Sequence, residues 1–412
     1  GVTSIVDLFS FDTTLSEASQ LIANQTAPNL FYAGVLFTNP GGHGTQFGGS
    51  ALEVTSFEAI DDLWQQHMAR KPHLTKAVIE TFGGHGASLT DKQLTEIGRR
   101  SKAAGLPYFV HVSTLEDGKR AIKAGATALA HGINSELVDE EFIALMVKHK
   151  VAYIPTLAVY YNHSAEHEHQ QISANTTLLA TVPDKLQHCL FDKVPVPSKW
   201  KGITWQKKQL AYKNLNLLAR AGITIGAGSD AGNPYTLHGS GLHNEMQALS
   251  QSGLTTAQVI NAATIDAAKI IDAPELGQLK QGFQASFILL EQNPLNDISQ
   301  LSNIKTVYKS GEKIDRKDLI AQNKKLAPLG EECNVAESTS TIANKVIDNF
   351  NGSIQWQTIS DTMMGGKSAA VIAQKDNTLA IDTQLGKPGG FGAVREVCDL
   401  ICQAKSKRLN GL

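Results

Sequence analysis

The stretch PYFVHVSTLEDGKRAIKAGATALAHG, residues 107–132, decides the fold class. It opens with an apolar run that ends at His111, passes through a mixed polar and apolar segment, and closes with a second apolar run that ends at His131. The spacing of the two histidines corresponds to one helix followed by one strand. Short, continuously apolar runs are typical of parallel strands that are covered on both faces. The stretch therefore predicts a β-α-β unit.

The same pattern recurs from residue 1 to about residue 273. Helical patterns separate the apolar runs, as in DKQLTEIGRRSKAAG (91–105) and EFIALMVKHK (141–150). Seven parallel strands with helices between them predict an α/β protein with a (β/α)8 barrel that lacks one strand. The five further runs are TSIVDLF (3–9), LFYAGVLF (30–37), KAVIETF (76–82), VAYIPTL (151–157) and GITIGAG (222–228).

The chain changes character after the predicted barrel (residues 1–273). Residues 274–325 read as short antiparallel strands with turns, which we interpret as part of a small β-sandwich. Residues 326–345 are polar and small, as in a linker. Residues 346–412 read as β structure, and they are few for an independent β domain. The sequence thus predicts four segments with boundaries at these positions.

Composition excludes some partners of the chain. Of the 412 residues, 42% are hydrophobic and 18% are charged, and the formal net charge is -2. That balance gives no electrostatic reason to expect nucleic acid or an anionic membrane as a partner. No apolar run approaches the roughly 18 residues of a membrane span. We expect a small-molecule substrate, and both the oligomeric state and the compartment stay open.

Four polar side chains come at the ends of predicted strands. Glu80, His111 and His131 end three of these runs, and Asp230 follows GITIGAG in a series of small residues, where we expect a buried carboxylate. Functional groups of parallel barrels lie at the carboxyl ends of strands. Imidazole and carboxylate ligands suit zinc, with manganese, iron or cobalt as alternatives. The four residues together predict a divalent-metal site, although a single strand-end histidine is more often structural.

Several motifs in a fixed order resemble the amidohydrolase superfamily. The 107–132 stretch resembles its fifth and sixth strands, and GAGSDAG (226–232) resembles its eighth-strand motif. The run LHNEMQALSQSGLTTAQVINAATIDAAKIID (242–272) is similar to the imidazolonepropionase-like branch, which includes Xaa-Pro and Xaa-Arg dipeptidases. The resemblance covers residues 1 to about 314.

The resemblance implies a role for each strand-end residue. His111 and His131 would bind one metal ion, and Asp230 would bind a second and act as the general base. Many relatives carry a carboxylated lysine on the fourth strand, where this chain offers Glu80. The implied cofactor is one or two divalent ions, with zinc favoured. The implied reaction is hydrolysis of an amide in a dipeptide, an N-acyl amino acid or a cyclic amide, by water that the metal activates.

Four further side chains are candidates for substrate binding. His43 and His85 lie in glycine-rich loops, and glycine allows a ligand to approach the backbone closely. His43 resembles a loop histidine that contacts substrate in similar dipeptidases. Tyr153 and Tyr160 lie where similar enzymes bind a substrate carboxylate. Simple loop structure for His85, and packing in the core for the two tyrosines, are equally good accounts.

Two features of the chain leave other functions open. The His-x-His pair of the first barrel strand is not in this chain, so we expect the chain alone to be inactive. The segment VIDNFNGSIQWQTISDTMMGGKSAAV (346–371) resembles the start of the complex I intermediate-associated protein family, a galactose-binding-like jelly roll. The alternatives are a metal-dependent deaminase or lactonase on the same barrel, a non-catalytic scaffold, and a binding or assembly protein that acts through this C-terminal module.

Overall fold

In the computed structural model, the chain forms two compact units. The first comprises residues 1–45 and 49–331, and the second comprises residues 46–48 and 332–412. His85 and the predicted linker 326–345 lie outside the described residues. The structure describes residues 1–22, 27–45, 51–80, 88–160, 198–233, 236–325, 369–375 and 378–384.

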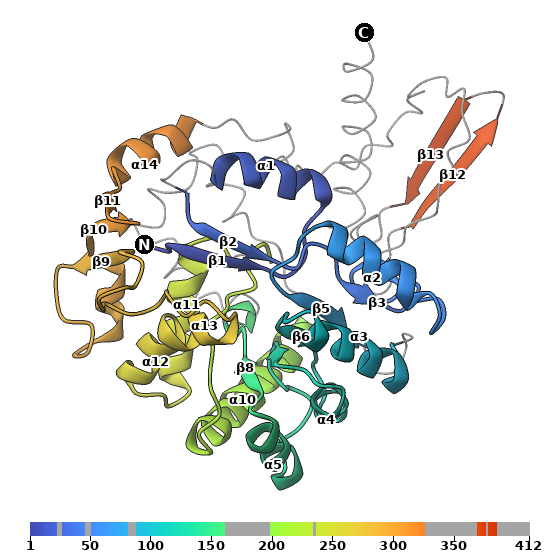
Figure 1. The fold of residues 1–412 in the computed structure, drawn as a ribbon, viewed down its shortest axis with the longest axis horizontal. Coiled ribbons are helices and arrows are strands. Elements are labelled where there is room, and N and C mark those ends of the chain that lie inside the picture. The colour runs from blue at the N-terminus through green and yellow to red at the C-terminus, as the bar shows by residue number, and fades with distance from the viewer. Residues whose placement is uncertain are drawn as a thin grey trace. The chain divides into compact units, whose positions relative to one another are not determined.

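A parallel sheet forms the centre of the first unit (Figure 1). Strands β5 (Thr75–Val78), β6 (Tyr108–His111), β7 (Ala128–Ala130) and β8 (Ala152–Ile154) pair in parallel in chain order, β5 with β6, β6 with β7 and β7 with β8. This confirms the α/β fold with a parallel sheet that the sequence predicts. The sheet order is β4 (Leu52–Glu53), β3 (Phe37–Thr38), β5 (Thr75–Val78), β6 (Tyr108–His111), β7 (Ala128–Ala130) and β8 (Ala152–Ile154).

The predicted strand 30–37 is not continuous. Its first part belongs to β2 (Asn29–Tyr32), which pairs in parallel with β1 (Ser4–Asp7), and its last residue belongs to β3. Gly34 lies between them with φ +73°, a left-handed conformation that no strand residue adopts. The carbonyl of Tyr32 still accepts a hydrogen bond from the N–H of His73, just before β5. The turn at Gly34 thus redirects the chain, and a contact to the β5 segment remains.

The predicted strand 222–228 is only partly formed. Ile225 makes an isolated parallel bridge to Tyr153 of β8. The N–H of Tyr153 donates to Thr224 O over 2.9 Å, and the N–H of Gly226 donates to Tyr153 O over 3.0 Å. The segment therefore follows β8 in the sheet, as the predicted order requires. Closure into an eight-stranded barrel stays a prediction.

The helices cover the sheet in chain order. Helices α2 (Ile60–Ala69), α3 (Asp91–Ala103), α4 (Leu115–Lys123) and α5 (Glu140–His149) pack each against the next (Figure 1). Thr90 begins α3 with a capping box to Gln93, and Asp139 begins α5 by accepting from the N–H of Phe142. These two helices confirm the predicted helices 91–105 and 141–150. The described helices of the first unit are α1 (Asp12–Ile22), α2 (Ile60–Ala69), α3 (Asp91–Ala103), α4 (Leu115–Lys123), α5 (Glu140–His149), α10 (Ser198–Arg220), α11 (Ser240–Gln251), α12 (Thr256–Ala262), α13 (Ile265–Ile270), the 3-10 helix η2 (Ile298–Ser302) and α14 (Arg316–Lys325).

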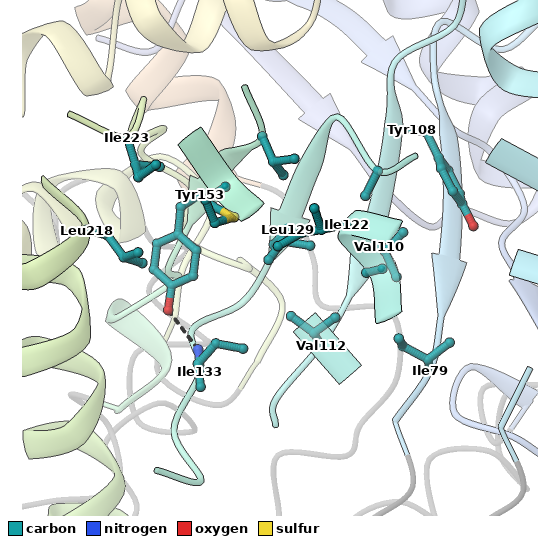
Figure 2. Packing of buried hydrophobic residues seen from close by; sticks show 14 of the residues in the cluster. Ile79, Tyr108, Val110, Val112, Ile122, Leu129, Ile133, Tyr153, Leu218 and Ile223 are labelled. Atoms are coloured by element: carbon teal, nitrogen blue, oxygen red, sulfur yellow. Dashed lines mark hydrogen bonds between the residues drawn. The ribbon is translucent and has the colours of Figure 1, made fainter. Parts of the chain in front are cut away.

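Strand β6 shows how the two faces of the sheet differ. Tyr108 and Val110 belong to the large core cluster that also contains buried residues of the helices (Figure 2). Phe109, on the opposite face, belongs to a second cluster with Ala128 and Ala152. Because side chains alternate along a strand, His111 shares the face of Phe109. The face away from the helices therefore carries the predicted site residue.

The strands that follow β8 in the described chain form antiparallel sheets. Strands β9 (Phe287–Leu290), β10 (Ile304–Lys309) and β11 (Glu312–Lys313) form a three-stranded sheet, which agrees with the antiparallel strands predicted after residue 273. In the second unit, β12 (Ala369–Lys375) pairs with β13 (Thr378–Gln384). The jelly-roll assignment stays a prediction. None of the described helices is long and apolar enough to cross a bilayer.

Buried His67 predicts that the fold weakens in acid. Its side chain on α2 is 0% exposed, it packs against Phe37 and Trp64, and burial lowers its pKa to about 4. An unfolded histidine takes up a proton below about pH 6.5, so the unfolded state binds more protons between pH 6.5 and 4. The free energy of unfolding is therefore not reduced by His67 above pH 6.5, and it falls as the pH drops toward 4. We expect a loss of about 2–3 kcal/mol at pH 4.5 from this residue.

The measurement is the free energy of urea unfolding of wild type and His67→Met between pH 7.5 and 4.5. Other buried histidines act in the same direction, so the difference between the two pH profiles isolates His67. If the free energy of unfolding depends on pH in the same way in the two proteins, His67 does not cause the loss of stability in acid.

Candidate functional site

Residues from four chain segments meet at one edge of the parallel sheet. Glu80 follows β5 by two residues, His111 is the last residue of β6, and His131 directly follows β7. Asp230 follows the segment that extends the sheet beyond β8. Because the strands are parallel, their carboxyl ends lie at the same edge, which is where such folds place chemistry. We call these four residues and His43 the edge cluster.

Three imidazoles lie side by side in the edge cluster. The ring centroids of His111 and His131 are 4.4 Å apart, and those of His43 and His111 are 4.9 Å apart. His43 comes from the turn after β3, so three separate connections supply the rings. Imidazoles crowded in this way repel one another when protonated, which favours their neutral forms.

Each strand-end histidine has a carboxylate beside it. The Nε2 atom of His111 lies 3.6 Å from Oε2 of Glu80, and Nδ1 of His131 lies 3.9 Å from Oδ2 of Asp230. Both distances exceed a hydrogen bond, so these are proximities rather than bonded pairs. Within the described part of the chain, no group of three or more histidine, cysteine, aspartate or glutamate residues has the arrangement of a metal site. The four-residue metal centre stays a prediction.

Burial keeps the imidazoles neutral. It is the largest cause that lowers the pKa of His43, His111 and His131, and for His111 the pKa falls well below its usual value. The negative charge of Asp230 acts in the opposite direction on His131. A neutral imidazole has a free lone pair, which is the form that binds a metal ion. The donor types therefore fit a divalent metal, although the present spacing of the side chains does not form a closed ligand set.

Lys76 acts electrostatically on the histidines of the edge cluster, and it was not predicted from the sequence. It lies on β5, is only 4% exposed, and its positive charge contributes to lowering the pKa of all three histidines. Burial lowers the pKa of Lys76 itself to about 8, while Asp230 raises it. Val78 pairs with His111, and Lys76 lies two residues before Val78 on the same strand. Alternate residues of a strand share a face, so this spacing places Lys76 on the face of His111.

Left-handed backbone conformations gather at this edge. His131 has φ +75°, Asp230 has φ +51° and Thr156 has φ +47°. Non-glycine residues seldom adopt such angles, and a β-branched threonine does so least readily. Each costs about 1–3 kcal/mol and persists only where the surroundings enforce it, as they do at functional sites. The strain supports the view that this edge is built for chemistry rather than for stability.

The environment of Asp230 differs from the predicted one. Its side chain is 43% exposed, so the expected buried carboxylate is wrong. Asn233 Nδ2 donates to Asp230 Oδ2 over 2.8 Å, which holds the carboxylate in its turn. The glycines before Asp230 allow close packing and do not widen the site: a Cβ on Gly228 would lie 2.7 Å from Ile154 Cγ2. The exposed carboxylate is thus displayed by a tightly packed segment.

The two tyrosines support the loop that follows β7. Tyr153 is fully buried, and its hydroxyl accepts the N–H of Ile133 over 2.7 Å (Figure 2). The hydroxyl of Tyr160 accepts a hydrogen bond from Asn134 Nδ2. Buried Asn214 of α10 also holds this loop, because its amide donates to Ile133 O over 2.9 Å. Substrate binding by the tyrosines stays a prediction, as does the role of His85.

Comparison with known proteins identifies the family. The pattern of the Amidohydrolase family matches residues 55–314, and the chain belongs to this family. Among curated proteins it is similar to the ochratoxinase of Aspergillus niger, with 25% identity over 340 residues. That alignment covers 74% of this chain and 63% of the relative, so the chain matches less than two thirds of the relative's length.

Solved structures share the fold of the chain. A Xaa-Pro dipeptidase with bound methionine superposes with a TM-score of 0.59 at 20% identity, over 76% of this chain and 75% of the other. The A. niger ochratoxinase gives 0.59 at 21% identity, over 76% and 71%. Molinate hydrolase gives 0.56 at 17% identity, over 83% and 77%. The family match thus assigns the chain to the Amidohydrolase family, and the solved structures show the fold that it shares with them.

Proposed function

We propose that the protein is a metal-dependent hydrolase that cleaves the amide bond of a dipeptide or an N-acyl amino acid. The observation that carries the proposal is the edge cluster, in which three neutral imidazoles stand beside two carboxylates at the carboxyl edge of a parallel sheet. The similarity to a Xaa-Pro dipeptidase favours dipeptides among the amides.

The proposed roles follow from the chemistry of each side chain. His111 and His131 would hold a divalent metal, most simply zinc, with Glu80 beside His111 and Asp230 beside His131. A divalent metal polarises a carbonyl oxygen and makes water acidic enough to lose a proton near neutral pH. Asp230, exposed at the edge, takes that proton and returns it to the departing nitrogen. His43, half-buried beside His111, contacts the substrate.

Lys76 is a second candidate for the fourth-strand ligand that the family places there. A buried ammonium would oppose a metal ion beside His111 and His131, whereas a carboxylated lysine is negative and carries two ligand oxygens. The lowered pKa of about 8 makes the fraction of neutral amine, the form that adds carbon dioxide, larger than in an ordinary lysine. The neutral amine nitrogen bonds to the carbon of carbon dioxide and releases one proton, so its charge changes from zero to negative; counted from the ammonium form, two protons are released.

One experiment tests the proposal. The full-length protein is loaded with zinc, and both zinc per chain and hydrolysis of a panel of dipeptides and N-acyl amino acids are measured. We expect His111→Gln and His131→Gln to lose zinc and hydrolysis, while His149→Gln, an exposed histidine at the end of α5, keeps both. Comparing Lys76→Met with Glu80→Gln identifies the fourth-strand ligand. Full hydrolysis by metal-free protein would refute the proposal.

A further inference from the structure

Glu245 is a buried carboxyl group outside the edge cluster. It lies on α11, its side chain is 0% exposed, and its Oε2 accepts the N–H of Ala158 over 2.6 Å. Among the described residues, its Oε1 has no hydrogen-bond partner. An incompletely satisfied carboxyl in the core is unfavourable for stability, so its presence there calls for a function.

The backbone that Glu245 holds is the turn after β8. The carboxyl accepts the N–H of Ala158 in this turn, and the adjacent N–H of Leu157 also acts to lower its pKa. Thr156, the residue before them, is buried and has a φ of +47°. A threonine relaxes out of this conformation unless its neighbours are fixed. Glu245 supplies that fixation from a helix 87 residues away in the sequence.

Thr156 in turn holds a histidine of the edge cluster. Its Oγ1 lies 2.9 Å from Nδ1 of His131, within hydrogen-bond distance, whereas the Oδ2 of Asp230 lies 3.9 Å from the same nitrogen. The hydroxyl therefore determines the orientation of the ring and occupies Nδ1. Only Nε2 is then left for a metal ion or a substrate. A partner that occupies one ring nitrogen commonly fixes the tautomer and the angle of a ligand histidine.

We propose that Glu245 is a positioning residue, which fixes the turn 156–158 and thereby holds the Thr156 hydroxyl against Nδ1 of His131. The orientation of the ring is a property of this chain alone. Its consequence for metal binding and hydrolysis rests on the proposed function. The competing explanation is that Glu245 only stabilises the core, in which case its loss lowers stability and leaves the ring of His131 unchanged.

The first test follows the imidazole directly. The chain is labelled with ¹⁵N-histidine, and the ring signals of His131 are identified by their loss in His131→Asn. We expect Glu245→Gln, which keeps an acceptor for the N–H of Ala158, to leave these signals in place. Glu245→Leu removes the acceptor and should shift them, as should Thr156→Val, which removes the hydroxyl. Unchanged His131 signals in Glu245→Leu would overturn the proposal.

The second test separates positioning from stability by a double-mutant cycle on zinc affinity, measured by competition with a chelating dye. Loss of such a supporting partner commonly lowers metal affinity by about 10- to 100-fold. We expect that loss in Glu245→Leu and in Thr156→Val, and no further loss in the double variant, since both act through one hydroxyl. Additive losses would contradict the proposal.

Two further comparisons keep the outcome decisive. If Glu245→Leu does not fold, Glu245→Asp replaces it, because the shorter side chain withdraws the carboxyl from the turn and keeps the charge. If the zinc-loaded full-length protein hydrolyses no amide but shows the His131 shifts, the proposed function is refuted and this inference stands. If the protein hydrolyses amides but its His131 signals do not change in Glu245→Leu, the proposed function stands and this inference is refuted.

Discussion

Asp230→Asn is expected to lower the rate of amide hydrolysis by about 10²- to 10⁴-fold, the usual contribution of a general base. Asparagine has nearly the same shape and can keep the contact with Asn233, but its amide cannot accept the proton of the attacking water. Because the side chain is 43% exposed, the exchange leaves no buried polar group without a partner. We therefore expect the free energy of unfolding to stay within about 0.5 kcal/mol of wild type.

The measurements are kcat and KM for the best substrate of the panel, with circular dichroism and urea unfolding on the same samples. Asp272→Asn is the matched control, since Asp272 is also an exposed aspartate with a left-handed φ (+55°), and it directly follows the capping residue of α13. The control should keep full activity. Undiminished turnover in Asp230→Asn would remove this residue from the proposed mechanism.

Gly98→Ala is expected to destabilise the first unit by about 2–3 kcal/mol. A Cβ on Gly98, in the middle of α3, would lie 2.1 Å from the backbone oxygen of Ala124 and 3.0 Å from Cε1 of Tyr108. A carbonyl at the end of α4 has no rotamer that relieves this contact, so helices or strands must shift. Alanine favours a helix over glycine by about 1 kcal/mol, and the expected loss is what remains after that gain.

Hydrogen exchange of the β6 amides measures this effect, because these buried amides exchange through large-scale unfolding. Ala103→Val on the exposed end of the same helix is the control, and helix propensity limits its cost to about 0.7 kcal/mol. Equal protection in Gly98→Ala and wild type would mean that α3 and the end of α4 are not in close contact.

The sequence predicts most of the parallel sheet, because strands that are buried on both faces must be continuously apolar. It also predicts the strand-end histidines, because a polar residue at the end of such a run lies at the carboxyl edge. It does not predict the break at Gly34, since glycine is compatible with a strand as well as a turn. The role of Thr156 depends on a contact with His131 across the sheet, which no local pattern encodes. The predicted burial of Asp230 was wrong for the same reason, because the exposure of its side chain depends on how the surrounding chain packs.

The pairing order of β5 to β8 has a consequence for how the chain folds. β5 pairs with β6, β6 with β7 and β7 with β8, and one described helix separates the two strands of each pair in the sequence. Loop closure between such near neighbours loses little entropy, so this block can assemble early and in steps. The turn that holds His131 requires α11, which comes much later in the sequence. During synthesis the scaffold would therefore form before the edge cluster takes its final shape.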